Sequence, residues 1–218
     1  MLKKKQGGGA LYRQTDVNEY DQPAHIFALD YYRPGSGGDH EFSRKETWFY
    51  YFGDDEIQEE FTERVDDMVN ELFVENSVDW DYFTLAPSSR KASLNEHMEK
   101  LCSAISEKKV MEYRQVLERS RGIEESREFE SVKQKLANQK NSIDIKEDVD
   151  GKNIIIVDNV SVSGISLAFL TELLLNAGAE RVSCLVLGVT NHERFVRDLE
   201  EGIRASTAMA EIQGENNG

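Results

Sequence analysis

The sequence is poor in cysteine and contains no obvious metal-ligand pattern. It has 2 cysteines in 218 residues, Cys102 and Cys184, and each lies in an otherwise apolar stretch. This usage is typical of buried thiols in a reducing compartment and not of a disulfide framework. There is no C-x-x-C pair and the 4 histidines are scattered, which argues against a zinc site built by the protein alone.

Long apolar runs are also missing, because no stretch approaches the roughly 20 residues that a membrane-spanning helix needs. The N-terminal segment MLKKKQGGG is basic but lacks the apolar core of a signal peptide. We therefore expect a cytoplasmic protein with no membrane contact.

Positive charge is scarce as well. The chain has 26 lysines and arginines against 41 acidic residues, for a formal net charge of -15. An acidic surface repels nucleic-acid phosphates unless its few cations are clustered, so the charge gives no support for general DNA or RNA binding.

The N-terminal third of the chain has mixed patterns. Residues 1–24 are polar and predict a flexible arm, and residues 25–78 predict a separate N-terminal subdomain, here called the hood. Within the hood we expect strands at 25–32 and 45–52, the second rich in aromatic residues, which could pair as a hairpin. Apolar residues at helical spacing then predict an acidic helix over about 54–76.

From residue 79 to 205 the pattern predicts an α/β core with a mostly parallel, twisted sheet flanked by helices. Apolar runs predict strands at 80–86, 153–158 and 181–189, the last two buried on both faces. Helices are expected after a cap at Ser93, within the charged segment after Gly122, at 166–176, and from Asn191 to about 204. Residues 206–218 are expected to be disordered.

The most informative segment is the connection at 154–167, with the sequence IIIVDNVSVSGISL. A buried strand ends in Asp158, passes through small hydroxyl residues and Gly164, and then opens a helix. Main-chain N–H groups and the helix dipole favour an anion at such a helix N-terminus. An acid beside a phosphate cradle suits the hydroxyls and phosphate of a ribose 5-phosphate.

This segment closely resembles the motif with which type I phosphoribosyltransferases bind phosphoribosyl pyrophosphate (PRPP). The resemblance implies the α/β fold of that family and extends over about residues 79–190, most clearly over 151–190. The spacing of arginines and serine in the segment 119–127, with Phe129 after it, looks like the ComF-like branch, which resembles the amidophosphoribosyltransferases.

The resemblance also implies a site. The ribose would be held by Asp158 and Asn159, with Mg²⁺ as cofactor reached through Asp158. The 5′-phosphate would be bound by Ser161, Val162, Ser163, Gly164, Ile165 and Ser166, and the diphosphate by Ser88, Ser89, Arg90 and Lys91. A mobile segment that closes over the reactants would contribute Arg119 and Arg121.

Two positions depart from the family pattern. Asn159 stands where the motif has a second acid, so it brings no negative charge. Val162 stands where several members carry threonine or an aspartate that can act as base. No zinc ribbon of the kind that often begins ComF-like proteins is present either.

Three functions remain open from the sequence. The first is an enzyme that transfers the phosphoribosyl group of PRPP to a nitrogen of an unknown base or amine and releases diphosphate. The second is a non-catalytic subunit that senses PRPP or a nucleotide within a regulatory or defence complex, and the third is a scaffold without a ligand. A homodimer or a larger protein complex is compatible with each of them.

Overall fold

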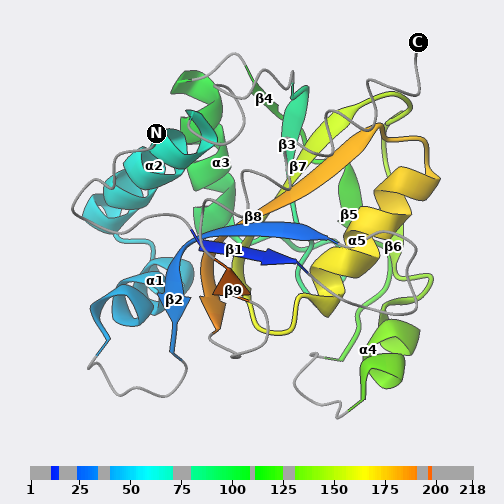
Figure 1. The fold of residues 1–218 in the computed structure, drawn as a ribbon, viewed down its shortest axis with the longest axis horizontal. Helices are drawn as coiled ribbons and strands as arrows, with labels where there is room; N and C mark the ends of the chain where they lie inside the picture. The colour runs from blue at the N-terminus through cyan, green and yellow to red at the C-terminus, as the bar shows by residue number, and fades with distance from the viewer. Residues whose placement is uncertain are drawn as a thin grey trace.

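A central β-sheet with helices against both faces forms the body of the molecule (Figure 1). The computed structural model describes residues 11–14, 24–33, 40–70, 80–108, 111–124, 131–190 and 196–197. The strands are β1 (Leu11–Gln14), β2 (His25–Tyr32), β3 (Tyr82–Leu85), β4 (Glu112–Tyr113), β5 (Leu117–Arg119), β6 (Ile143–Ile145), β7 (Asn153–Ser161), β8 (Arg181–Thr190) and β9 (Val196–Arg197). The helices are α1 (Glu41–Phe52), α2 (Asp55–Val69), α3 (Glu96–Lys108), α4 (Val132–Gln139) and α5 (Ile165–Asn176).

The 7-stranded sheet has the order β4-β3-β7-β8-β2-β1-β9. The first five strands in this order pair in parallel, whereas β1 pairs antiparallel with both β2 and β9. The predicted fold class, an α/β fold with a mostly parallel sheet flanked by helices, is confirmed. A second sheet of 2 strands, β5 and β6, lies beside it.

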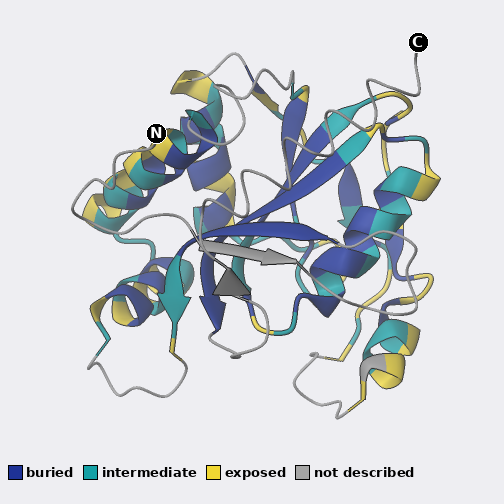
Figure 2. Ribbon diagram, in the orientation of Figure 1, coloured by how far each residue is buried: buried dark blue, intermediate teal, exposed yellow. Residues whose placement is uncertain are grey.

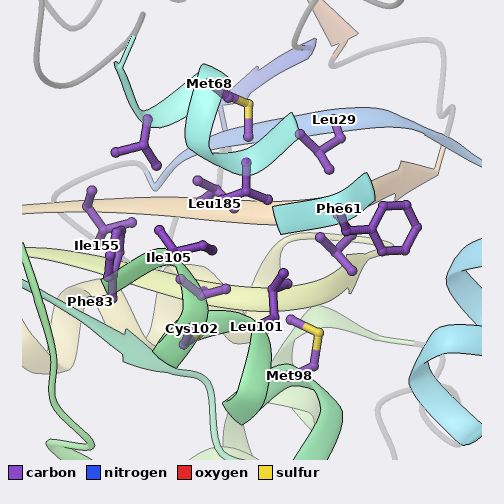
Figure 3. Packing of buried hydrophobic residues seen from close by; sticks show 14 of the residues in the cluster. Leu29, Phe61, Met68, Phe83, Met98, Leu101, Cys102, Ile105, Ile155 and Leu185 are labelled. Atoms are coloured by element: carbon purple, nitrogen blue, oxygen red, sulfur yellow. The ribbon is translucent and has the colours of Figure 1, made fainter. Parts of the chain in front are cut away.

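Burial on both faces explains the continuous apolar runs. Ile154, Ile155 and Ile156 in β7 are all fully buried, since alternate side chains enter different clusters. One cluster joins the sheet to α1, α2 and α3, and Figure 3 shows Leu185 and Ile155 of the sheet near Leu101 and Ile105 of α3. The other cluster joins the opposite face to α5. Figure 2 shows both helical layers buried toward the sheet and exposed outward.

The predicted aromatic strand at 45–52 is wrong, because these residues belong to helix α1. His40 caps the helix, its Nδ1 accepting from the Ser43 N–H, and the helix ends at Gly53. Phe42, Glu46 and Phe49 are buried at spacings of four and three, which is a helical stripe. Aromatic residues favour strands, but packing of this stripe against α2 and the sheet outweighs that preference. Phe49 packs edge-on against Phe61 of α2 at 5.5 Å.

The hood is therefore not a hairpin of strands set apart from the core. β2 forms at the predicted place, but it pairs in parallel with β8 inside the central sheet. β1 lies within the segment predicted as a flexible arm and adds a strand to β2. Local patterns in the N-terminal residues could not show where these strands pair. The partner of β2 is β8 and the second partner of β1 is β9, and both lie more than 150 residues farther along the chain.

The remaining predictions agree with the structure with small changes. α2, α3, α5, β3, β7 and β8 form near their predicted positions, and α4 follows Gly122 as expected. The cap of α3 is Asn95 and not Ser93, because Asn95 Oδ1 accepts from the N–H groups of His97 and Met98. Val196 and Arg197 form a strand, which contradicts a helix through these residues. The other residues of 191–204, residues 71–76 of the acidic helix and the tail 206–218 lie outside the described residues.

None of the helices in the part of the chain described above is both long and apolar enough to cross a membrane.

Gly188 in β8 allows α1 to approach the sheet closely. A Cβ at this position would lie 2.9 Å from Cβ of Tyr32 and 3.2 Å from Cε1 of Phe42. Both contacts are closer than side-chain atoms normally allow, and Phe42 is buried and cannot move aside freely. The missing side chain therefore sets how near α1 lies to the carboxyl ends of the strands.

We expect Gly188→Ala to lower the free energy of unfolding by about 1–3 kcal/mol, as overpacking does in well-packed cores. Gly122→Ala is the matched control, because a Cβ there would meet its nearest atom at an ordinary 3.8 Å. Urea unfolding of both variants measures the difference. An unchanged stability of Gly188→Ala would show that α1 does not depend on this close approach.

Candidate functional site

A pocket of about 460 Å³ opens at the carboxyl ends of the parallel strands. This is the edge at which α/β sheets commonly bind ligands. The pocket is lined by the end of β7 and the turn after it, the loop after β3, α1, and residues near α4. The lining residues used below are Tyr32, Glu46, Thr47, Tyr50, Tyr51, Ser88, Ser89, Asn95, Arg119, Glu124, Gln139, Asp158, Asn159, Ser161, Val162, Ser163, Gly164 and Ser166.

The strand β7 extends further than the sequence predicts. It continues through Ser161, which pairs with Val189 of β8, so the acidic position and Asn159 lie within the strand and not in a loop. Asp158 and Asn159 are partly buried and both line the pocket. The turn into α5 is thus reduced to residues 162–164, and the Thr190 hydroxyl fixes it by donating to the Val162 carbonyl at 3.0 Å.

The start of α5 has the features of an anion site. Gly164 is the N-cap with φ of 75°, a left-handed conformation in which a side chain would be strained. No side chain caps this helix end within the described residues, and Ser163 and Gly164 line the pocket, so the first N–H groups are available to a ligand at this turn. Ser161 is 4% exposed and its hydroxyl has no hydrogen-bond partner among the described residues. A buried donor without a partner is costly unless a ligand satisfies it.

The predicted diphosphate loop divides into two parts. Ser88 and Ser89 line the pocket, whereas Arg90 and Lys91 are exposed and do not line it. The segment after β5 holds this loop, because the Ser89 carbonyl accepts a hydrogen bond from the Ile123 N–H at 2.9 Å. The structure therefore brings the hydroxyls of the loop to the pocket but leaves its two cations outside.

Arg119 lies beneath this loop, in β5, and is buried. Its guanidinium donates to the main-chain carbonyls of Pro87 and Ser88 and to the side chains of Gln139 and Ser142. Burial, and then the charge of Arg121, lower the pKa of Arg119 to about 10, so it stays charged at neutral pH. Arg119 lines the pocket but is committed to holding the loop.

Arg121 is exposed and points elsewhere. Its Nη2 donates to the carbonyls of Asn138 and Lys140, at the end of α4. The two arginines thus lie in ordered contacts, where the sequence predicts part of a mobile segment. Residues 125–127 of that segment lie outside the described residues.

The sequence prediction missed Glu46, which α1 carries into the same pocket. Glu46 is 2% exposed, and its Oε1 accepts from Asn159 Nδ2 at 2.9 Å. Burial, and to a smaller extent the nearby charge of Asp158, raise the pKa of Glu46 to about 7. The hydrogen bond from Asn159 acts in the opposite direction but does not outweigh burial. Burial likewise raises the pKa of Asp158 to about 6. An acid on the apolar stripe of a helix would have been the signal, had the segment been recognised as helical.

Aromatic side chains line the side of the pocket formed by β2 and α1. Tyr32, Tyr50 and Tyr51 lie there, with the Tyr32 hydroxyl 3.2 Å from Thr47 Oγ1. Asn95 Nδ2 donates to the Tyr50 carbonyl at 2.9 Å and ties α3 to this side. The aromatic segment 48–52 is therefore divided, since Phe49 is in the core while Trp48 and Phe52 are exposed.

The oxygen donors at the end of β7 fit a hard cation such as Mg²⁺. Mg²⁺ is usually held by one or two carboxylates together with substrate oxygens, and the pocket lining offers the carboxylates of Asp158, Glu46 and Glu124. Among the described residues there is no group of three or more histidine, cysteine or acidic side chains that could hold a metal ion. A magnesium ion here would thus depend on oxygens of the ligand.

Comparison with known families agrees with this geometry. Residues 103–201 match the family model of the phosphoribosyl transferase domain. This region includes β7, the turn and α5. Over this region, which is a little less than half of the chain, the protein is similar to that domain. The matched region contains the strand, the acid and the helix at the centre of the pocket, and the ComF-like branch stays a prediction.

Solved structures of phosphoribosyltransferases are similar to the chain at low identity. A hypoxanthine-guanine phosphoribosyltransferase from Bacillus anthracis is 15% identical with a TM-score of 0.40, over 61% of this chain and 68% of that one. A variant hypoxanthine phosphoribosyltransferase from Trypanosoma cruzi, complexed with the product IMP, is 11% identical with a TM-score of 0.43, over 62% and 65%. No curated protein matches the chain.

The buried carboxyl of Glu46 predicts a pH-dependent stability of the protein. Its pKa rises from 4.5 to about 7 on folding, so the folded state binds this proton more tightly and the free energy of unfolding falls as pH rises through that window. At about 1.4 kcal/mol per pKa unit, the loss is at most about 3 kcal/mol. Asp158 acts in the same direction.

We expect Glu46→Gln to melt at a higher temperature than the wild type at pH 8, with the difference shrinking toward pH 4.5. Thermal melts across this range measure it. Exposed Glu41 of the same helix supplies the control Glu41→Gln. Parallel melting curves for Glu46→Gln and the wild type at all pH values would contradict the buried, desolvated carboxyl.

The buried contacts of Arg119 predict that replacing it costs more stability than replacing Arg121, which is exposed. Arg119→Lys keeps the charge but cannot span four acceptors, so we expect a loss of about 1.5–3 kcal/mol in the free energy of unfolding. Arg121→Lys is the matched control, and its exposed contacts should cost less than about 1 kcal/mol. Chemical unfolding distinguishes the two, and equal losses would show that Arg119 does not hold the loop.

Proposed function

We propose that the chain binds PRPP together with Mg²⁺ and transfers its phosphoribosyl group to a nitrogen of a small acceptor, with release of diphosphate. The observation that carries this proposal is the convergence, in one pocket, of Asp158, the uncapped start of α5 and the unpartnered Ser161 hydroxyl. An acid for sugar hydroxyls thus lies beside a cradle for a phosphate.

The residues have separate tasks in this proposal. Asp158 and Asn159 hold the ribose hydroxyls, and the 5′-phosphate lies against residues 161–166. Ser88 and Ser89 face the diphosphate, while Arg119 positions their loop. Arg90, Lys91 and Arg121 lie outside the pocket lining, so any contact with diphosphate would require them to move.

The transfer breaks the bond between C1 and the diphosphate oxygen, and the electron pair leaves with diphosphate. The lone pair of the acceptor nitrogen forms the new C1–N bond, and a proton passes from that nitrogen to solvent. Mg²⁺, when bound, neutralises diphosphate charge. The carboxylate of Asp158 favours the positive charge that develops on the ribose ring, because fixed charges act strongly in a partly buried site.

The tyrosines are the proposed acceptor side. Tyr32, Tyr50 and Tyr51 offer flat apolar faces, and Glu46 and Asn95 lie among them. A planar nitrogen base or an amine suits such a surface better than an acidic acceptor, because the charged group on this side is the carboxyl of Glu46.

A sensing subunit is the second candidate, and one observation favours it. Arg119 is the one lysine or arginine among the residues that line the pocket in the described structure, and it is committed to the protein. So few free cations leave a departing diphosphate with little stabilisation, which is compatible with binding of the ligand without fast turnover.

Calorimetric titration with PRPP and Mg²⁺ tests the proposal. We expect saturable binding that weakens at least about tenfold in Asp158→Ala, since a hydrogen bond to a charged group contributes about 1.5–3 kcal/mol. Asp144→Ala is the control, because Asp144 is an exposed acid in β6. Release of diphosphate with one of a panel of bases and amines would support the enzyme.

Binding without release would support the sensing subunit instead. Unchanged binding in Asp158→Ala, or none in the folded wild type, would rule out this site for PRPP.

A further inference from the structure

Glu46 is a charged side chain of the pocket that makes no contact with PRPP in the proposed function. It lies on α1 between Phe42 and Phe49, and 2% of its surface is exposed. Burying a carboxylate is costly unless hydrogen bonds compensate it. The face of a helix that packs against a core ordinarily carries an apolar residue at such a position. The contacts of Glu46 must therefore explain why an acid stands there.

The contact of Glu46 with Asn159 has a defined direction. Asn159 Nδ2 donates to Glu46 Oε1 at 2.9 Å. When Glu46 is ionised its carboxylate only accepts hydrogen bonds, so the amide then turns its NH₂ group toward Glu46. This leaves Oδ1, the carbonyl end, to accept a hydrogen bond from a ligand in the pocket. An aspartate at 159 would present an accepting oxygen to that ligand in the same way.

Charge explains why the amide and the acid occupy these two positions. Asp158 already raises the pKa of Glu46 through like-charge repulsion. A carboxylate at 159, at hydrogen-bond distance from Glu46, would place a third negative charge in the same partly buried volume. An amide at 159 avoids this repulsion and still offers an oxygen.

The pair is held by parts of the fold that are far apart in sequence. Glu46 and Asn159 are separated by 113 residues, and α1 reaches β7 because Gly188 allows the helix to lie close to the sheet. A contact fixed by a buried helix and a central strand is rigid enough to orient a ligand group.

We propose that Glu46 is a positioning residue that orients Asn159 so that its Oδ1 accepts a hydrogen bond from a ribose hydroxyl. In this arrangement the negative charge that the family motif carries at position 159 is supplied by Glu46 on α1. Glu46 lies behind Asn159 and does not contact the ligand itself. The inference rests on the proposed function, since it assigns the ribose side of the same pocket.

The test exchanges acid and amide between the two positions. Calorimetry measures the affinity of ribose 5-phosphate, and of PRPP with Mg²⁺, for the wild type, Glu46→Gln, Asn159→Asp and the double variant Glu46→Gln/Asn159→Asp. We expect each single variant to bind about tenfold more weakly, because Glu46→Gln makes the charged hydrogen bond a neutral one and Asn159→Asp sets two carboxyl groups against each other. The double variant should return to within about threefold of the wild type, because an amide at 46 can donate to a carboxylate at 159.

Two controls separate this role from a general structural one. Glu41→Gln, on the exposed side of α1, should bind like the wild type. Inorganic diphosphate with Mg²⁺ lacks a ribose, so the Glu46 and Asn159 variants should bind it with unchanged affinity. Thermal melts of every variant confirm that it is folded.

The outcomes distinguish the positioning role of Glu46 from the proposed binding of PRPP. If the wild type binds PRPP and Asp158→Ala does not, but Glu46→Gln binds normally, the positioning role is wrong and the function stands. A double variant no better than Asn159→Asp also overturns the role. If the folded wild type binds neither PRPP nor ribose 5-phosphate, the proposed function fails and the inference fails with it.

Discussion

The parallel pairing of β7 between β3 and β8 determines where the pocket forms. Leu85 pairs with Val157, and Val157 with Leu185, so all three strands run toward one edge of the sheet. The loop after β3 and the turn after β7 leave the sheet at that edge. Groups more than 70 residues apart in sequence, such as Ser88 and Ser161, therefore line one pocket.

Two constraints then give the pocket its chemical character. The turn at Gly164 exposes the uncapped start of α5, and Arg119 holds the opposite loop through its main-chain carbonyls. Since Arg119 is used to fix the backbone, the pocket offers mainly N–H groups and hydroxyls to an anion. Its charged side chains are mostly acids, which favours a ligand that arrives with a cation.

Helix α1 completes the pocket at a cost in stability. Glu46 remains desolvated beside Asp158, and burial raises the pKa of both carboxyls. Functional sites often keep such unfavourable charges because binding depends on them. Gly188 removes the steric obstacle that would hold α1 away from β7. The helix contacts the acidic end of β7 through the hydrogen bond from Asn159 to Glu46.

The sequence by itself determined the α/β core and the strand, turn and helix around which the pocket forms. The apolar run 153–158 is short, rich in β-branched residues and followed by a turn signal, which favours a strand buried on both faces with the acid, glycine and hydroxyl residues at its carboxyl end. The family resemblance agreed with that reasoning. The tertiary structure alone decided the N-terminal part, where aromatic residues at 45–52 have strand preference but form a helix because Phe42, Glu46 and Phe49 pack on one side. It also placed β1 and β2 in the sheet and Glu46 against Asn159, since contacts between distant residues leave no local pattern.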